Sequence, residues 1–169
     1  FFEVYDDEKN ARLDVVTHLP AEYAHLAEGC PGIHIHEAKF SRSEIHEQFM
    51  RQADVLVLPT HVESFGMVAL EALAHGLALI ATDVYALREL VEDGINGRLI
   101  SPPISIWNDF LPSTLYYDIQ NAKQYIRAAD TTVFEKQLID SMKQFTHDSN
   151  WRLSARQASA NLMVERFAC

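Results

Sequence analysis

The chain has 169 residues, of which 48% are hydrophobic and 10% aromatic, and its formal net charge is −10. This length and composition allow one globular domain with a hydrophobic core, and they exclude a disordered chain. The acidic balance argues against a surface for nucleic acid or for an anionic membrane, because both need clustered Lys and Arg.

The N-terminal part of the chain predicts two strands separated by a short helix. Residues 1–10 pass from apolar to acidic, which is typical of the end of a helix. Residues 13–18 form the first predicted strand. Residues 32–36 alternate apolar and polar side chains, which favours an outer or half-buried strand. The short helix between them, closed by Gly29, rests on three apolar residues at helical spacing: Tyr23, Leu26 and Ala27.

A capping box and a continuous apolar run come next. Ser41 and Glu44 have the spacing of a capping box, so a helix begins there and continues over apolar residues at helical spacing, Ile45, Phe49 and Ala53. Residues 55–58 (VLVL) are all apolar, as in a parallel strand that is buried on both faces. We therefore expect a central parallel strand at this position.

The stretch after this strand predicts a strand–helix–strand crossover. Residues 60–66 form a polar loop that ends in Gly66, where a glycine lets the backbone approach a ligand. A helix follows, and Gly76 suits its left-handed C-terminal end. Residues 77–81 are the next buried strand, which completes a βαβ unit. The apolar residues whose helical spacing predicts this helix are Met67, Leu70 and Ala74.

The rest of the chain extends the α/β pattern and then departs from it. Asp83 is expected to cap a short helix, and residues 98–100 form a last short strand after a glycine turn. Residues 104–132 are aromatic and polar and are interpreted as an insertion, helical around 118–129. Residues 133–168 predict two amphipathic C-terminal helices. The buried side of the short helix is expected to hold Ala86, Leu87, Leu90 and Val91.

Together these elements predict an α/β fold, a Rossmann-like doubly wound parallel sheet with helices on both faces. In such sheets ligands bind at the carboxyl ends of the strands. The N–H groups that begin the helix at Gly66 point to this edge, with a dipole of roughly half a unit charge that suits an anion such as a diphosphate. Glu63 and Glu71 bracket the same loop. We expect both carboxylates to face one crevice.

These motifs resemble a known family. The segment ESFGMVALE, from Glu63 to Glu71, is preceded by ADVLVLP and followed by AHGLALIATD and ELVEDGING. It is similar to the donor-binding, C-terminal half of the group 1 glycosyltransferases, glycosyltransferase family 4 of the GT-B fold. The resemblance runs from about residue 13 to 102. It implies a retaining, metal-independent transfer of a sugar from a nucleotide diphosphate sugar to a glycan, lipid or small-molecule acceptor, without a cofactor.

The resemblance also implies roles for particular residues. Glu63 would contact the transferred sugar as the catalytic residue, and Glu71 would bind the ribose. Tyr85 and Ala86 depart from the small or glycine pair that is common in the family. The residues expected to bind the donor are Lys39 at the nucleobase, His61, Ser64, Phe65, Gly66, Met67 and Val68, together with Glu71.

The resemblance further implies that residues 1–169 are one nucleotide-sugar-binding domain, truncated at its N-terminus. The family's first strand, with the Arg and Lys that follow it, and the N-terminal acceptor domain would be missing partners. The fragment alone is then expected to bind donor weakly and to turn over nothing. Its oligomeric state stays open.

Other interpretations remain open at this stage. Glu63 also suits a helix entry, where a carboxylate compensates the dipole, and Glu71 can pair with His75 one turn later. The histidines lack the ligand set of a zinc site, so no metal is predicted. The domain could instead be a non-catalytic nucleotide-sugar sensor or assembly module whose insertion binds a protein, or a GT-B epimerase.

Cysteine usage and hydropathy bear on the compartment. Cys30 and Cys169 are too few for a disulfide framework and favour a reducing compartment, so a cytoplasmic location is expected. No apolar run reaches the roughly 18 residues that a membrane-spanning helix needs. A peripheral attachment of the longer protein to a membrane is left open.

Overall fold

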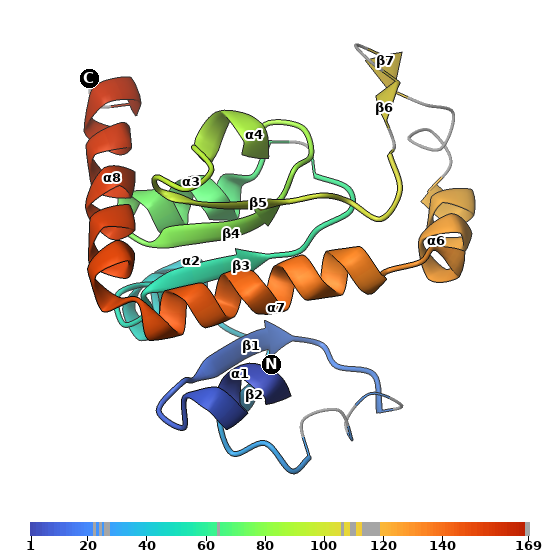
Figure 1. Cartoon of the computed structure of the whole chain (residues 1–169), viewed down its shortest axis with the longest axis horizontal. Coiled ribbons are helices and arrows are strands. Elements are labelled where there is room, and N and C mark those ends of the chain that lie inside the picture. Colours follow the sequence, from blue (N-terminus) through green and yellow to red (C-terminus); the bar gives the residue numbers. More distant parts are fainter. Residues whose placement is uncertain are drawn as a thin grey trace.

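Parallel strands alternate with helices in the computed structural model (Figure 1). Five parallel strands form two groups. β1 (Leu13–Thr17) pairs with β2 (Ile33–Glu37), while β3 (Val55–Leu58), β4 (Ala78–Thr82) and β5 (Gly97–Ile100) pair in that order. The residues that the structure describes are 1–21, 23, 25, 28–63, 65–105, 107–108, 111–112 and 119–167.

Helices connect and cover these strands, and a short hairpin follows them. The main connecting and C-terminal elements are α1 (Phe2–Asp7), α2 (Arg42–Ile45), the π-helix η2 (His46–Met50), α3 (Met67–Ala74), α4 (Leu87–Leu90), α6 (Ile119–Ala128), α7 (Thr132–His147) and α8 (Ser149–Phe167). Between β5 and α6, β6 (Trp107–Asn108) pairs antiparallel with β7 (Leu111–Pro112).

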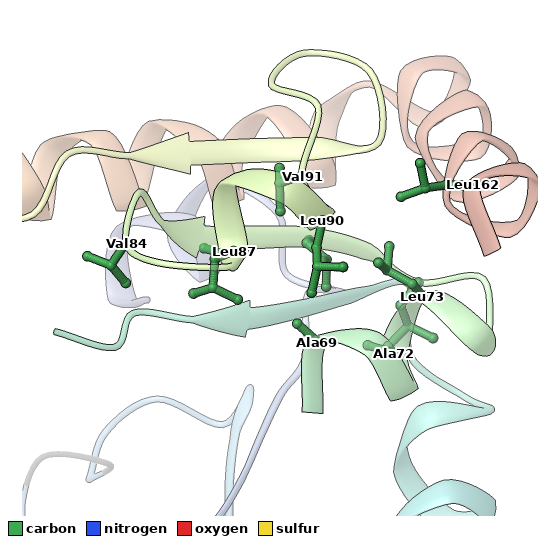
Figure 2. Packing of buried hydrophobic residues seen from close by; sticks show 11 residues of the cluster. Ala69, Ala72, Leu73, Val84, Leu87, Leu90, Val91 and Leu162 are labelled. Atoms are coloured by element: carbon green, nitrogen blue, oxygen red, sulfur yellow. The ribbon is translucent and has the colours of Figure 1, made fainter. Parts of the chain in front are cut away.

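Side chains of a strand alternate between its faces, and the two faces of β4 pack against two clusters of helical residues, with α8 contributing to both. Leu79 and Ala81 pack into a cluster with α3, α4 and Leu162 of α8. Figure 2 shows this cluster between the sheet and the helices. Ala78 and Ile80 pack on the other side with residues of α1, α7 and α8. This arrangement confirms the predicted α/β fold with helices on both faces.

Many predicted elements are confirmed close to their expected bounds. The capping box is present, since Glu44 N donates to Ser41 Oγ at 3.3 Å and Ser41 N donates to the Glu44 carboxylate at 2.8 Å. The C-terminal helices and a helix inside the proposed insertion are also found. The predicted short helix cannot be judged at Leu26 and Ala27, which lie outside the described residues.

The predicted helix is present as α3, but its buried face is not the row of residues whose spacing predicted it. Met67 is 53% exposed, whereas the buried residues of α3 are Ala69, Ala72 and Leu73. The sequence of this helix, MVALEALA, is apolar on almost every side, so helical spacing alone does not select one face. Packing against α4, β4 and α8 makes the choice (Figure 2).

The predicted central position of β3 is also not found. Within the described residues, β3 pairs with β4 alone, and its four apolar residues are only half-buried. β4 is the strand with partners on both sides, and all five of its residues are buried. The apolar run of β3 therefore reflects an environment that this chain does not fully supply.

The turn after β4 differs from the expected cap as well. Ala86 precedes α4, and no side chain caps that helix. Asp83 instead forms an ion pair with Arg88, whose Nε lies 3.0 Å from the carboxylate. Tyr85 has a φ of +49°, a backbone region in which glycine is at ease and a tyrosine is strained.

The packing of α3 yields a stability prediction. Leu73 is fully buried, so Leu73→Ala leaves a cavity and should lower the free energy of unfolding by about 2 to 5 kcal/mol. Leu153 of α8 is 62% exposed and provides a matched control, for which Leu153→Ala should cost less than about 0.5 kcal/mol. Urea denaturation of the two variants measures both values. Equal losses would show that α3 does not pack as described.

Candidate functional site

The loop after β3 enters α3 through a residue that must be glycine. Gly66 precedes the helix with a φ of +78°, in the left-handed region. A Cβ placed on it would lie 2.8 Å from Cδ2 of Leu87. Both the backbone angle and the close approach of Leu87 in α4 therefore disfavour a side chain here. The glycine sets the direction in which α3 leaves the loop.

Glu63 folds back onto the beginning of α3. The N–H of Gly66 donates to Oε1 of Glu63 at 3.2 Å. The O of Gly66 accepts the first helical hydrogen bond, from Leu70 N at 3.0 Å. A helix leaves the N–H groups of its first turn without intrahelical acceptors, and Met67 and Val68 belong to that turn. Glu63 and the first turn of α3 are thus brought together, as the sequence predicted.

One backbone amide at the start of α3 differs from what the resemblance implies. The resemblance assigned the amide of Gly66 to a ligand, but in the unliganded structure Glu63 accepts from it. A negative carboxylate suits this place because the N-terminal end of a helix is positive. A ligand that uses the Gly66 amide must therefore compete with Glu63 or add a second acceptor to the same N–H.

Glu71 is held by two basic side chains from the preceding connection. A terminal nitrogen of Arg42 lies 2.6 Å from its Oε1, and Nε2 of His46 lies 3.1 Å from its Oε2. The Glu71 side chain as a whole is 18% exposed, so it is largely covered but not fully buried. The alternative pairing with His75 is not what the structure shows, since the ring of His75 packs on that of His46, 4.9 Å between centroids.

His61 lies in the same loop but faces α7. Its ring packs on Phe134, with 5.5 Å between centroids. Its Nδ1 is buried, and no hydrogen-bond partner reaches that atom within the described residues. Burial lowers the pKa of the His61 imidazole, because the charged form loses its hydration. His61 is therefore a neutral packing residue here, and its role toward a donor stays a prediction.

The remaining predicted residues are placed differently. Phe65 and Met67 are 50% and 53% exposed, so the entry to α3 offers apolar side chains as well as amides. Ser64 lies outside the described residues. Lys39 follows β2, and its Nζ pairs with Glu37 at 3.2 Å.

The site is a surface formed by the loop, α2 and α3. Two cavities of about 170 Å³ lie elsewhere, one between β5 and α7 and one between residues 92–96 and α8. Among the described residues, no group of three or more His, Cys, Asp or Glu is placed to hold a metal ion. None of the described helices is long and apolar enough to cross a membrane.

Arg42 and His46 were missed by sequence reasoning. They lie on the helix before β3, and the contact with Glu71 exists only because α2 and η2 pack beside α3. One structural sign marks the place: His46 begins a π-helical turn, a conformation that is frequent at functional sites. Nothing in the local sequence pattern distinguishes that turn from an ordinary α-helix.

The fold and this loop define an α/β domain whose ligand-binding edge lies at the carboxyl ends of its parallel strands. A family model described as "Glycosyl transferases group 1" matches residues 3–109. This match covers more than half of the chain, and the chain belongs to the group 1 glycosyl transferases. The resemblance seen around residues 63–71 is thereby confirmed.

Curated relatives and solved structures agree with this family. The D-inositol 3-phosphate glycosyltransferase of Paenarthrobacter aurescens (strain TC1) is 43% identical over 84 residues, which are 49% of this chain and 20% of that protein. The chain thus spans about a fifth of that relative's length. The crystal structure of WaaG, a glycosyltransferase involved in lipopolysaccharide biosynthesis, has a TM-score of 0.66 at 21% identity, over 95% of this chain and 35% of WaaG.

A second solved structure contains a nucleotide. Anabaena Alr3699/HepE in complex with UDP has a TM-score of 0.61 at 16% identity, over 93% of this chain and 37% of that one. At these identities the two structural likenesses establish the fold. The GT-B neighbours confirm the Rossmann-like architecture that the sequence predicted.

The geometry of Gly66 predicts a specific loss of stability. Gly66→Ala places a Cβ in the left-handed region, at about 1 to 2 kcal/mol, and also against Leu87. Gly76 has a φ of +69°, but a Cβ placed on it would have no neighbour closer than 3.9 Å. Gly76→Ala should therefore lose stability only through backbone strain. Urea denaturation should find Gly66→Ala worse by about 1 kcal/mol or more. Equal losses in the free energy of unfolding would mean that the Leu87 side chain moves away from the new Cβ without destabilising the fold.

The burial of His61 predicts a pH dependence of stability. Its folded-state pKa is lowered, so the unfolded chain binds more protons as the pH falls toward and below the ordinary value of about 6.5. The stabilisation is therefore present above that pH and is lost on acidification. His61→Gln should flatten the fall of the thermal midpoint between about pH 7.5 and 5.5. His34→Gln, at an exposed histidine, is the control and should keep the parent's slope.

Proposed function

We propose that this chain is the donor-binding domain of a retaining glycosyltransferase that uses a nucleotide diphosphate sugar. The observation that carries the proposal is the pairing of Glu63 with the Gly66 amide at the start of α3. It joins a carboxylate and helix N–H donors at the carboxyl edge of a parallel sheet. Family membership supports the same assignment.

The first turn of α3 suits the diphosphate and the sugar. Its N–H groups and the helix dipole favour negative charge, which grows on the leaving diphosphate as the glycosidic bond to the nucleotide breaks. Glu63 lies beside these donors and can accept hydrogen bonds from sugar hydroxyls or balance positive charge on the reacting carbon. In a retaining transfer the acceptor attacks from the face that the diphosphate leaves.

Glu71 suits the ribose diol. An ionised carboxylate offers two oxygens, each with more than one acceptor position, so the bonds from Arg42 and His46 leave room for two hydroxyls. These two partners fix the orientation of the Glu71 side chain before a donor binds. The UDP found in the Anabaena neighbour supports a uridine nucleotide as the first donor to test.

The acceptor remains the part of the reaction that other elements must supply. Because the chain spans about a fifth of its curated relative, we propose that the acceptor site belongs to a further domain of the longer protein. The side chains of Phe65 and Met67 are exposed next to the proposed donor site. The chain alone should then bind donor without transferring sugar.

Calorimetric titration with UDP-, GDP- and ADP-glucose tests the proposal. Binding of at least one donor is expected, and Glu71→Ala should weaken it by about tenfold to a hundredfold, because a hydrogen bond to a charged group is worth about 1.5 to 3 kcal/mol. The same donor without its ribose hydroxyls should bind both proteins equally.

Glu47→Ala is the matched control for this experiment. Glu47 lies on η2, pairs with Arg51 at 3.1 Å and is 60% exposed. Its removal should leave donor affinity unchanged. If the parent and Glu71→Ala bind every donor equally, the role proposed for Glu71 is refuted.

A further inference from the structure

The two basic partners of Glu71 differ in how firmly the fold holds them. Arg42 is the first residue of α2, and its side chain is 69% exposed. His46 is the first residue of η2, and its side chain is 24% exposed. The two contacts use different oxygens of the carboxylate, with Arg42 on Oε1 and His46 on Oε2. Each partner can therefore be removed while the other contact stays in place.

The backbone of His46 is fixed by the turn that it begins. Its N–H donates to the carbonyl oxygens of Arg42 and Ser43, and its own carbonyl oxygen accepts from Arg51 N at 3.0 Å. Met50, the last residue of η2, is 5% exposed and anchors this turn in the interior. The π-helical turn therefore fixes the direction in which the His46 side chain leaves the backbone.

The ring of His46 is held by ring packing as well as by its hydrogen bond. It meets the ring of His75 edge to face, with 4.9 Å between centroids and 67° between planes. The N–H of His75 donates to the carbonyl oxygen of Glu71 at 3.2 Å, so the end of α3 carries this second ring. Nε2 of His46 lies 3.1 Å from Oε2 of Glu71. Because a carboxylate only accepts hydrogen bonds, Nε2 is the donor.

Arg42 is held less firmly, although its contact is the shorter of the two at 2.6 Å. The contact is made at the end of a long side chain that is mostly exposed. Such an ion pair contributes little, because ordering the long side chain costs entropy and salt screens the charges. The contact with His46 should therefore set the orientation of Glu71, and Arg42 should have a smaller part.

We propose that His46 is a positioning residue of the donor site, which holds Oε2 of Glu71 so that the free acceptor positions of the carboxylate face the ribose hydroxyls. This inference rests on the proposed function, in which Glu71 binds the ribose. Without the His46 donor, the Glu71 side chain must be ordered when the donor binds, and this ordering lowers affinity. His46 does not touch the donor, so its whole effect passes through Glu71.

A double-mutant cycle of His46→Phe with Glu71→Ala tests the proposal. The ligand is UDP-, GDP- or ADP-glucose, whichever binds the parent most tightly by calorimetry. His46→Phe keeps a ring beside His75 but removes the N–H donor, and it should weaken binding about tenfold. In the Glu71→Ala background the same change should have no further effect. The same donor without its ribose hydroxyls should bind the parent and His46→Phe equally.

Two further variants separate positioning from packing. His46→Gln has a side-chain amide that can still donate to Glu71, so it should bind the donor more tightly than His46→Phe. Arg42→Gln should weaken binding only about twofold, as expected for an exposed ion pair. His34→Leu, at an exposed histidine of β2, is the matched control and should keep the parent's affinity. Thermal midpoints of all variants show whether a loss of binding reflects a loss of folding.

Three results would overturn the inference, and they differ in what they say of the proposed function. Equal binding by the parent and His46→Phe, while Glu71→Ala binds more weakly, removes the role of His46 and leaves that of Glu71 standing. A loss of affinity that persists in the Glu71→Ala background also removes it, because His46 would then act on the donor directly or through the fold. If Glu71→Ala itself has no effect, the roles of both residues are refuted.

Discussion

The parallel pairing of β3 with β4 is the constraint on which the rest of the structure depends. Val55 to Leu58 stand opposite Ala78 to Ala81 in register. Parallel neighbours cannot be joined by a hairpin, so the chain must leave the carboxyl end of β3, cross over one face as α3 and return. This crossover brings the polar loop of residues 60–66 and the start of α3 to the same edge of the sheet. Gly66 then fixes the angle between loop and helix.

The same crossover explains why two carboxylates are prepared before any ligand binds. Glu63 is oriented by a backbone amide of its own loop. Glu71 is oriented by side chains of α2 and η2, which pack beside α3 as the preceding connection of the sheet. If the proposed donor site is correct, both groups lose little conformational entropy on binding, because their side chains are already held in place.

Much of this fold could be predicted from the sequence because local signals agree with it. The βαβ unit, the capping box at Ser41 and the C-terminal helices each have a pattern that depends on neighbouring residues alone. The buried face of α3 could not be predicted, since its apolar residues surround the helix and tertiary packing selects among them. The contacts of Arg42 and His46 with Glu71 join residues far apart in the sequence, so no local pattern announces them.

The central claim is that Glu63, Glu71 and the first turn of α3 form one donor site. Titration of the ¹⁵N-labelled chain with UDP-glucose, followed by backbone amide chemical shifts, tests it most directly. We expect the largest amide shifts on residues 65–71 and on Arg42 and His46. The amide shifts of the residues that line the cavity between β5 and α7 should not change. Shifts confined to that cavity, with the loop and α3 unaffected, would contradict it.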